Sequence, residues 1–251
     1  IREVLGRGPI GPGDIAGIVG CGQMHSVLLL DRSGAPIRPA ILWLDQRSTA
    51  ECMELTRRVG AERLFRITGT PAANTFSAPK LMWLASHEPE AWTRAAHVVF
   101  SKDYVNWRLC GEIGTDRSMM SATLLCDIAR GAWSDEVCRA ADLPVDCLPK
   151  VFAATDVLGR VTPRAAAETG LAAGTPVFAG ASDCACLLLG AGAAEPGDAC
   201  IYTGTCSGIF VVRGEPTLDP LCRLEVQAHA GRLDRHLDAG RPIFQGILCP
   251  H

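Results

Sequence analysis

Short apolar runs bounded by turn residues dominate the first part of the chain. Residues 15–20 and 27–30 have the composition of buried strands, and the polar stretch 21–25 interrupts the apolar pattern between them. The turn 31–34 follows, and the apolar residues 37–43 predict a further strand. The pattern therefore predicts several short strands, with a polar break after the first.

Longer stretches with helical spacing of apolar residues lie between the strands. Residues 48–59 form one, and another opens at Ser77, where Pro79 takes an early position at which a missing N–H costs nothing. Helices are also predicted at residues 101–111 and 162–170, and each ends at a glycine. Because strands and helices alternate, we predict a mixed α/β architecture.

The clearest strand-to-helix junction ends at Asp183. Residues 174–183 read as a turn, a buried strand and a small-residue elbow, and residues 184–192 are apolar and long enough for a helix. Ligands gather outside the carboxyl ends of strands in open α/β sheets. A carboxylate there can accept a proton from a substrate hydroxyl during phosphoryl transfer. Asp183 can equally cap the helix by accepting a backbone N–H, and the junction alone leaves both interpretations open.

A second feature of interest is a glycine-containing loop between two predicted strands. Residues 199–202 and 209–212 are strand-like, and residues 203–208 between them are small and rich in Gly, Thr and Ser. Such a loop lets backbone N–H groups approach a phosphate closely. It is also an ordinary composition for a hairpin turn.

Composition excludes some classes of function. The chain has 251 residues, 48% of them hydrophobic, with 24 basic and 27 acidic residues and no basic run, so nucleic-acid binding has no support. No apolar stretch reaches bilayer-spanning length. The N-terminus has no signal-like segment, so we expect a cytoplasmic protein. Because the chain does not begin with Met, we also expect that it starts partway into a longer one.

The cysteines require a separate interpretation. There are twelve, at positions 21, 52, 110, 126, 138, 147, 184, 186, 200, 206, 222 and 249. They form no Cys-x-x-Cys pair, and no His is spaced to complete a zinc site. Most lie in apolar or Ala-rich surroundings, where Cys behaves as a small hydrophobe. We expect reduced, mostly structural thiols, and a redox or zinc protein would rest on the count alone.

Eight short motifs, taken together, point to a known family. They are residues 22–25 (Gly-Gln-Met-His), 39–47, 76–83, 102–104 (Lys-Asp-Tyr), 111–116, 133–135 (Trp-Ser-Asp), 179–183 and 204–208. Their order and separations, from about residue 14 to residue 212, resemble the FGGY family of carbohydrate kinases, most closely its xylulokinase branch.

The resemblance implies an actin-like, ribonuclease-H-like ATPase fold of two domains with the sugar and ATP in the cleft between them. Residues 1–194 would be part of the N-terminal sugar-binding domain. Residues 195–251 would begin the C-terminal nucleotide domain and end in a divergent tail. ATP and Mg²⁺ would be the cofactors, with Mg²⁺ held through ATP phosphates and water rather than by protein ligands.

The resemblance also assigns site residues. Asp183 matches the catalytic base and would contact the sugar. Met24 and His25 match sugar contacts, although Met24 could simply belong to the core. Trp43 matches an aromatic wall of the sugar site, with a buried core Trp as the alternative. We expect Asp45 and Arg47, on the same loop, to form a surface or structural ion pair. Gly204 and Thr205 match a loop that touches ATP phosphates.

Three departures from the family pattern weaken the assignment of the sugar and of the nucleotide site. Cys184 replaces the Asn or Gln that usually follows the catalytic Asp and contacts sugar, and Cys206 stands where Ser is common. The family's opening phosphate-binding segment would precede Ile1. Past about Gly214 the chain no longer follows the family, and the tail resembles nothing we can place.

The expected function is therefore transfer of the ATP γ-phosphate to a hydroxyl of xylulose or a related ketopentose. A kinase for gluconate, ribulose or a polyol is one alternative. A truncated, non-catalytic remnant that binds sugar or a partner is another. Beyond the sugar we expect no nucleic-acid or membrane partner. Apolar surface where the missing half should dock favours self-association, with a homodimer as its simplest form.

Overall fold

The computed structural model describes residues 1–203, 207–232 and 242–248. Its α-helices are α1 (Arg2–Leu5), α2 (Thr49–Val59), α3 (Ala61–Thr68), α4 (Ser77–His87), α5 (Pro89–Arg94), α6 (Ser101–Cys110), α7 (Arg117–Ser121), α8 (Asp135–Ala140), α9 (Pro163–Thr169) and α10 (Asp183–Gly190). Short 3₁₀ helices cover Pro12–Asp14 and Val145–Cys147.

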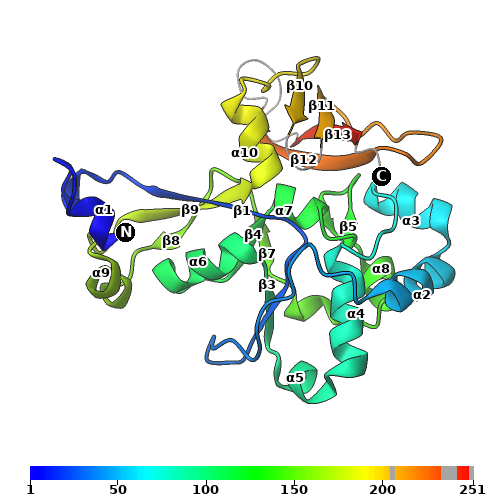
Figure 1. Ribbon diagram of the computed structural model, residues 1–251, viewed down its shortest axis with the longest axis horizontal. Helices are drawn as coiled ribbons and strands as arrows, with labels where there is room; N and C mark the ends of the chain where they lie inside the picture. Colours follow the sequence, from blue (N-terminus) through cyan, green and yellow to red (C-terminus); the bar gives the residue numbers. More distant parts are fainter. Residues whose placement is uncertain (204–206, 233–241, 249–251) are drawn as a thin grey trace.

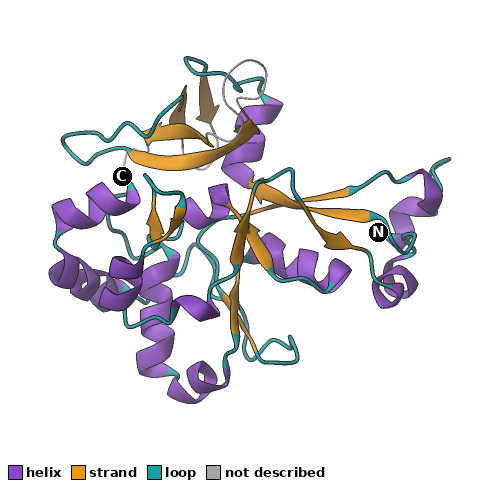
Figure 2. Cartoon of the chain, turned by 180° about the vertical axis from the view of Figure 1, so that it is seen from behind, coloured by secondary structure: helices purple, strands orange, loops and turns teal. Residues whose placement is uncertain are grey.

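The strands are β1 (Ile18–Gly22), β2 (Leu28–Leu30), β3 (His97–Val99), β4 (Gly114–Asp116), β5 (Cys126–Asp127), β6 (Ala132–Trp133), β7 (Lys150–Phe152), β8 (Val157–Arg160), β9 (Pro176–Ser182), β10 (Ala199–Thr203), β11 (Ser207–Arg213), β12 (Glu225–Arg232) and β13 (Pro242–Leu248). Helices and strands alternate along most of the chain, as the sequence predicts. In Figures 1 and 2 the helices α2, α3, α4, α5 and α8 gather in one lobe below the sheet formed by β10–β13.

The sheet that positions the candidate site is three-stranded, in the order β1-β9-β8. β1 and β9 run parallel, with Gly22 opposite Ser182 at their last residues, and β8 pairs antiparallel to β9. β4 and β7 form a separate parallel pair whose β4 strand contacts β9. Because β1 and β9 are parallel and end in register, the segments that follow them leave the sheet at the same edge.

The small residues that end β9 have a steric cause. Gly180 has a φ of +72°, in the left-handed region that disfavours every residue with a Cβ. A Cβ on Gly180 would lie 2.0 Å from the carbonyl oxygen of Gly20 on β1. The elbow before Asp183 is therefore glycine because two backbones approach too closely there for a side chain.

The main core lies within the lobe formed by α2, α3, α4, α5 and α8. Its buried side chains come from β2, α2, α3, α4, β3, α7 and α8, and include Leu29, Leu55, Leu64, Leu81 and Phe100. Local signals set several helices: Ser134 and Thr162 accept backbone N–H groups at the starts of α8 and α9, and Gly111 ends α6 in a left-handed conformation. Of these, α8 lines the main core, whereas α6 and α9 pack in a second cluster with Leu109 and Ala165.

The predicted strand at residues 37–43 is wrong. Only one isolated bridge forms within it, Val27 with Ile41, and the rest of the segment is a loop; a second bridge, Leu30 with Pro36, lies just before it. Pro39, within the run, has no N–H to donate to a ladder, which explains why the apolar run does not become a strand. Leu42 and Leu44 remain exposed on this loop.

The last strands form a four-stranded antiparallel sheet in the order β10-β11-β13-β12. β12 contacts α7 and α10, and the N–H of Ala228 donates to Ser121 Oγ over 2.9 Å. The tail after Gly214, which the sequence left without an assignment, therefore supplies two strands of a regular sheet. The loop between β10 and β11, with Gly204, Thr205 and Cys206, lies outside the described residues.

Candidate active site

Asp183 and His25 follow the two parallel strands that end together. Asp183 comes directly after Ser182, the last residue of β9, and His25 comes three residues after Gly22, the last residue of β1. The topology therefore brings both predicted site residues to one edge of the sheet. This edge is where α/β folds place their ligands.

Asp183 is the first residue of α10, and its side chain is exposed. The N-cap is Ser182, whose hydroxyl accepts the N–H of Ala185 over 3.4 Å. Interpreting Asp183 as the cap is therefore wrong, although its Oδ1 does accept the N–H of Cys184 over 2.9 Å. The surrounding protein partly removes water from the carboxylate, which raises the pKa of Asp183 above its ordinary value. A carboxylate with a raised pKa is a stronger base once it is ionised.

A buried polar network supports the backbone beside Asp183. Ser118 Oγ accepts the N–H of Ser182 over 2.9 Å and donates to Asp116, which caps α7. Asp116 in turn pairs with the ammonium of Lys102 over 3.0 Å, and Lys102 also binds Asp103 over 2.6 Å. The junction that presents Asp183 is thus fixed by side chains from α6 and α7.

Lys102 remains charged in this network. Burial alone would lower its pKa, but the carboxylates of Asp103 and Asp116 outweigh that effect, and the pKa of Lys102 lies above its ordinary value. Lys102 also donates to the carbonyl oxygen of Ala179 on β9 over 3.0 Å. One cation therefore joins α6, β4 and β9 beneath the candidate site.

His25 is held at three points. Its φ of +63° is in the left-handed region, which is unusual for a residue other than glycine. Nδ1 lies 2.8 Å from the carbonyl oxygen of Ala122, and Phe76 packs edge-on at 4.6 Å between ring centroids. Lys80 Nζ donates to the His25 carbonyl over 2.9 Å. The loop after β1 therefore presents this imidazole in one fixed orientation.

The imidazole of His25 is neutral near pH 7. Burial, with the charge of Lys80 as a smaller cause, lowers the pKa of His25 to about 4. Because Ala122 offers only a carbonyl oxygen, Nδ1 must carry the proton that it donates. Nε2 is then the acceptor of the ring, and it can receive a hydrogen bond from a hydroxyl.

The other predicted sugar contacts differ in exposure. Met24 is 9% exposed and packs within the main core, so only a small part of its surface is accessible. Trp43 is 40% exposed, which excludes the alternative of a buried core Trp. Cys184, in the first turn of α10, is half-buried. It packs against the main core and against a smaller cluster that includes Leu188 of α10 and Phe210 of β11.

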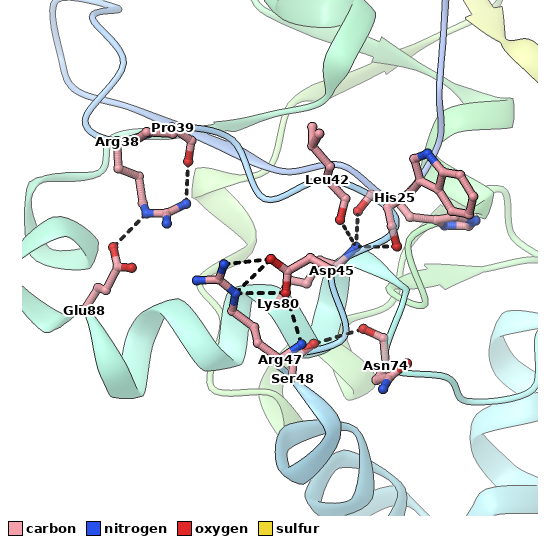
Figure 3. Close-up of polar contacts among 11 residues, drawn as sticks. His25, Arg38, Pro39, Leu42, Asp45, Arg47, Ser48, Asn74, Lys80 and Glu88 are labelled. Atoms are coloured by element: carbon pink, nitrogen blue, oxygen red, sulfur yellow. Dashed lines mark hydrogen bonds and ion pairs between the residues drawn. The ribbon is translucent and has the colours of Figure 1, made fainter.

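Asp45 and Arg47 form the ion pair that the sequence predicts. Arg47 Nη2 lies 2.7 Å from Asp45 Oδ2, and the guanidinium also stacks over the Trp83 ring at 4.7 Å. At the other end of this loop, Arg38 pairs with Glu88 over 2.7 Å (Figure 3). These contacts fasten the loop that carries Trp43 to α4 and to the residue after it.

One prediction falls outside the described residues. Gly204 and Thr205 are not among the described residues, so their contact with ATP phosphates stays a prediction. Within the described ranges, no group of three or more His, Cys, Asp and Glu side chains could hold a metal ion. In the same ranges, no helix has both the length and the apolar character needed to cross a bilayer.

Sequence reasoning missed the functional setting of two lysines. The chain has only three lysines, Lys80, Lys102 and Lys150, and the first two are buried. A buried lysine is rare unless it has partners. Two sequence features could have indicated a special role for Lys80 and Lys102. Lysine is rare among the 24 basic residues, and both lysines lie within the family-like motifs.

Comparisons with known proteins show the family of this chain. Residues 1–190 match the N-terminal domain of the FGGY family of carbohydrate kinases. The chain is 40% identical to the xylulose kinase of Lactococcus lactis over 195 residues, which are 78% of this chain and 38% of that protein. It is 36% identical to the xylulose kinase of Bacillus subtilis over 211 residues, 84% of this chain and 42% of that protein.

A solved structure gives the same result for the fold. The crystal structure of xylulose kinase from Rhodospirillum rubrum superposes with a TM-score of 0.84 and 33% identity, covering 93% of this chain and 46% of that one. The chain thus spans less than half the length of each of these three relatives. Over the length that it does share with them, this chain belongs to the FGGY family of carbohydrate kinases.

Proposed function

We propose that this chain is the sugar-binding part of a kinase that transfers the γ-phosphate of ATP to a hydroxyl of xylulose or a related ketopentose. The position of Asp183 carries the proposal, because an exposed carboxylate follows β9 at the edge where β1 leads to His25. The names of the relatives support xylulose as the acceptor.

In the proposed reaction, Asp183 accepts the proton of the sugar hydroxyl while that oxygen attacks the γ-phosphorus of ATP and ADP leaves. The neutral His25 would accept a hydrogen bond from another sugar hydroxyl at Nε2. Trp43 would offer an apolar wall and Met24 a small apolar contact. Most of the rate would come from positioning and electrostatic stabilisation, since little covalent chemistry falls to the protein.

ATP would supply the phosphoryl group, and Mg²⁺ would neutralise charge on its phosphates. Mg²⁺ is a hard ion that gives up its water reluctantly, so it would be held through the ATP phosphates and water rather than by protein ligands. We extend the proposal to Gly204 and Thr205 as phosphate contacts and to Cys184 as a sugar contact. The domain boundary at residue 194, a cytoplasmic location and a homodimer also stay predictions.

The proposal is tested by replacing Asp183 with Asn, which keeps the shape and removes the base. We expect ADP release with xylulose to fall by about a hundredfold or more while xylulose affinity stays within a few-fold. Asp146→Asn, at an exposed aspartate in a separate 3₁₀ helix, is the matched control. Turnover is measured by a coupled ADP assay on the complete gene product that contains this chain.

The outcomes separate the candidate functions. Unchanged turnover in Asp183→Asn would remove the assignment of the base. Faster turnover with gluconate, ribulose or a polyol would replace xylulose as the substrate. Xylulose binding with no turnover in the complete gene product would favour the non-catalytic alternative.

A further inference from the structure

Lys80 lies in the first turns of α4 and is completely buried. Its ammonium donates to the carbonyl oxygens of Thr75 over 2.6 Å, His25 over 2.9 Å and Leu42 over 2.9 Å. The carbonyl oxygen of Trp43 is the next nearest acceptor, at 3.5 Å. Figure 3 shows the ammonium between the loop of His25 and the loop of Leu42. One side chain thus connects three segments that are distant in the sequence.

The number of partners matches the chemistry of an ammonium group. Lysine has three N–H donors and no acceptor, and three carbonyls lie within 2.9 Å. These acceptors are neutral backbone groups rather than carboxylates. Asp45, the carboxylate that acts on Lys80 electrostatically, is itself paired with Arg47. The arrangement therefore fixes backbone positions more than it neutralises charge.

Two of the three carbonyls belong to the segments that carry the predicted sugar contacts. His25 sits in a disfavoured left-handed conformation, so its peptide needs an outside partner to stay there. Leu42 immediately precedes Trp43, on a loop that forms only isolated bridges. Val27 and Ile41 link the two segments by a pair of backbone hydrogen bonds of 2.9 and 3.0 Å, and Lys80 extends this link to the carbonyls of His25 and Leu42, next to the site.

We propose that Lys80 is a positioning residue of the sugar site, whose ammonium sets the placement of His25 and Trp43 by holding the carbonyl groups of their loops. The inference rests on the proposed function, because it takes His25 and Trp43 as sugar contacts. Lys80 itself would touch no substrate, since it is completely buried behind these loops.

The proposal requires the charged form of the side chain. A neutral amine has only two N–H donors, so deprotonation would leave one of the three carbonyls without a donor from Lys80. Burial lowers the pKa of Lys80 to about 8, and Asp45 opposes this effect. Sugar affinity should therefore fall as the pH rises through about 8.

Other groups near Lys80 do not change charge in this range. His25, on the loop after β1, is already neutral because its pKa is about 4. Asp45 and Arg47, on the loop before α2, hold each other ionised: the pKa of Asp45 is lowered and that of Arg47 is raised, chiefly by their hydrogen bonds. On α2, Glu51 approaches His87 at the opposite end of α4, and burial raises the pKa of Cys52.

The decisive experiment follows Lys80 and sugar affinity in the same protein. With three lysines in the chain, ¹³C-labelled lysine gives three side-chain signals by NMR, and exposed Lys150 is an internal reference. Xylulose affinity is measured by calorimetry between pH 6.5 and 9.5. We expect affinity to fall about tenfold, the effect of one lost hydrogen bond, with a midpoint that follows the Lys80 signal. Affinity that is flat across this range, or that follows another group, would overturn the proposal.

Two variants separate positioning from general stability. Lys80→Met should weaken xylulose binding about tenfold or more at pH 6.5 and abolish the alkaline fall. Lys80→Arg keeps the charge, so it should bind more tightly than Lys80→Met and show no fall near pH 8. Lys150→Met should match the unaltered protein. Equal affinity in Lys80→Met and the unaltered protein would refute the role, and the pH titration of the unaltered protein decides the matter if a variant does not fold.

Failure of the proposed function would look different. If the unaltered protein binds no tested sugar at pH 6.5, the function fails, but the positioning role can still be measured on the His25 ring by NMR. In Lys80→Met the pKa of His25 should rise above about 4, because a positive charge is removed, while burial, the larger cause, keeps it below its ordinary 6.5. An unchanged His25 titration in that variant would count against Lys80 itself.

Discussion

Lys80 and Lys102 are both buried, yet their surroundings balance their charges in opposite ways. Lys80 donates to three backbone carbonyls, and burial lowers its pKa to about 8. Lys102 binds one carbonyl and two carboxylates, and its pKa is raised because those carboxylates outweigh burial. The same side chain at similar depth is therefore close to losing its proton in one place and firmly charged in the other.

The difference matches what each lysine holds together. Lys102 joins α6, β4 and β9, which are regular elements with their own backbone hydrogen bonds, and its network ends at Ser182 beside Asp183. Lys80 joins α4 to two loops that are connected to each other only by an isolated β-bridge, Val27 with Ile41. The ion cluster of Lys102 therefore keeps its charge near pH 8, whereas Lys80, which has only carbonyl partners, begins to lose its proton there.

The largest effect expected from this comparison is that of Lys102→Met. The change would leave Asp103 and Asp116 buried without their cation, and breaking a buried ion pair typically costs about 3–5 kcal/mol of unfolding free energy. Urea unfolding followed by circular dichroism measures the loss. Lys150→Met, at an exposed lysine, should stay within about 0.5 kcal/mol. Similar losses in the two variants would mean that the ion cluster of Lys102 adds no more to the unfolding free energy than an exposed lysine does.

The pH dependence of stability should distinguish the two lysines next. The pKa of Lys80 is about 8 in the folded protein against 10.5 for a free lysine, so between these values the unfolded chain binds more protons. Stability from Lys80 therefore rises with pH across this window, is complete above 10.5, and is lost as the pH falls through 8. The expected gain is about 3 kcal/mol, from 1.36 kcal/mol per pKa unit.

Lys80→Met provides the control for that measurement, because thiols and tyrosines titrate in the same range. The difference in unfolding free energy between the unaltered protein and Lys80→Met should grow from pH 8 to pH 10.5. A constant difference would show that Lys80 keeps its ordinary pKa. Sugar affinity should move in the opposite direction over the same range, since the neutral amine supports the loops less well.

At pH 7 the stability loss in Lys80→Met should be smaller, about 1 kcal/mol. Two effects oppose each other there: three carbonyls lose a donor, but a buried charge without a carboxylate partner is also removed. Urea midpoints at pH 7 for Lys80→Met and Lys102→Met test the contrast directly. A loss in Lys80→Met as large as that in Lys102→Met would contradict the view that only Lys102 completes an ion cluster.

Much of the fold could be predicted from local sequence. The helices α2 (Thr49–Val59) and α6 (Ser101–Cys110) begin and end within a residue of their predicted limits, and each is followed by a glycine; α4 begins at Ser77 as predicted. The prediction failed at residues 37–43, where a proline overrides an apolar run. Periodicity alone does not register a missing backbone donor.

The candidate site could be predicted only in part. Asp183 and His25 follow strands, and the sequence pattern marks strand ends well. Lys80 could not be assigned from sequence, because its partners are backbone carbonyls at residues 25, 42 and 75, and a carbonyl has no residue-type signature. The roles of Lys102 and Ser118 likewise depend on contacts with residues more than sixty positions away.

Asp45→Asn should have the smallest effect on stability, yet it tests the difference between Lys80 and Lys102 most directly. Asp45→Asn removes a partly exposed ion pair with Arg47, which should cost less than about 1 kcal/mol. It also removes the carboxylate that raises the pKa of Lys80, so that pKa should move further below 8. The alkaline fall of xylulose affinity should then shift to lower pH with almost no change in the urea midpoint.

Asp31→Asn is the matched control for this shift, since Asp31 also lies in a turn and accepts hydrogen bonds from Ser33 and Ala35. It does not act on Lys80, so the affinity profile should keep its midpoint. A shift in both variants would indicate a general effect of net charge. A shift in Asp45→Asn alone would tie the pH response of the sugar site to the one ammonium group that Asp45 influences, and would separate it from the ion cluster under Asp183.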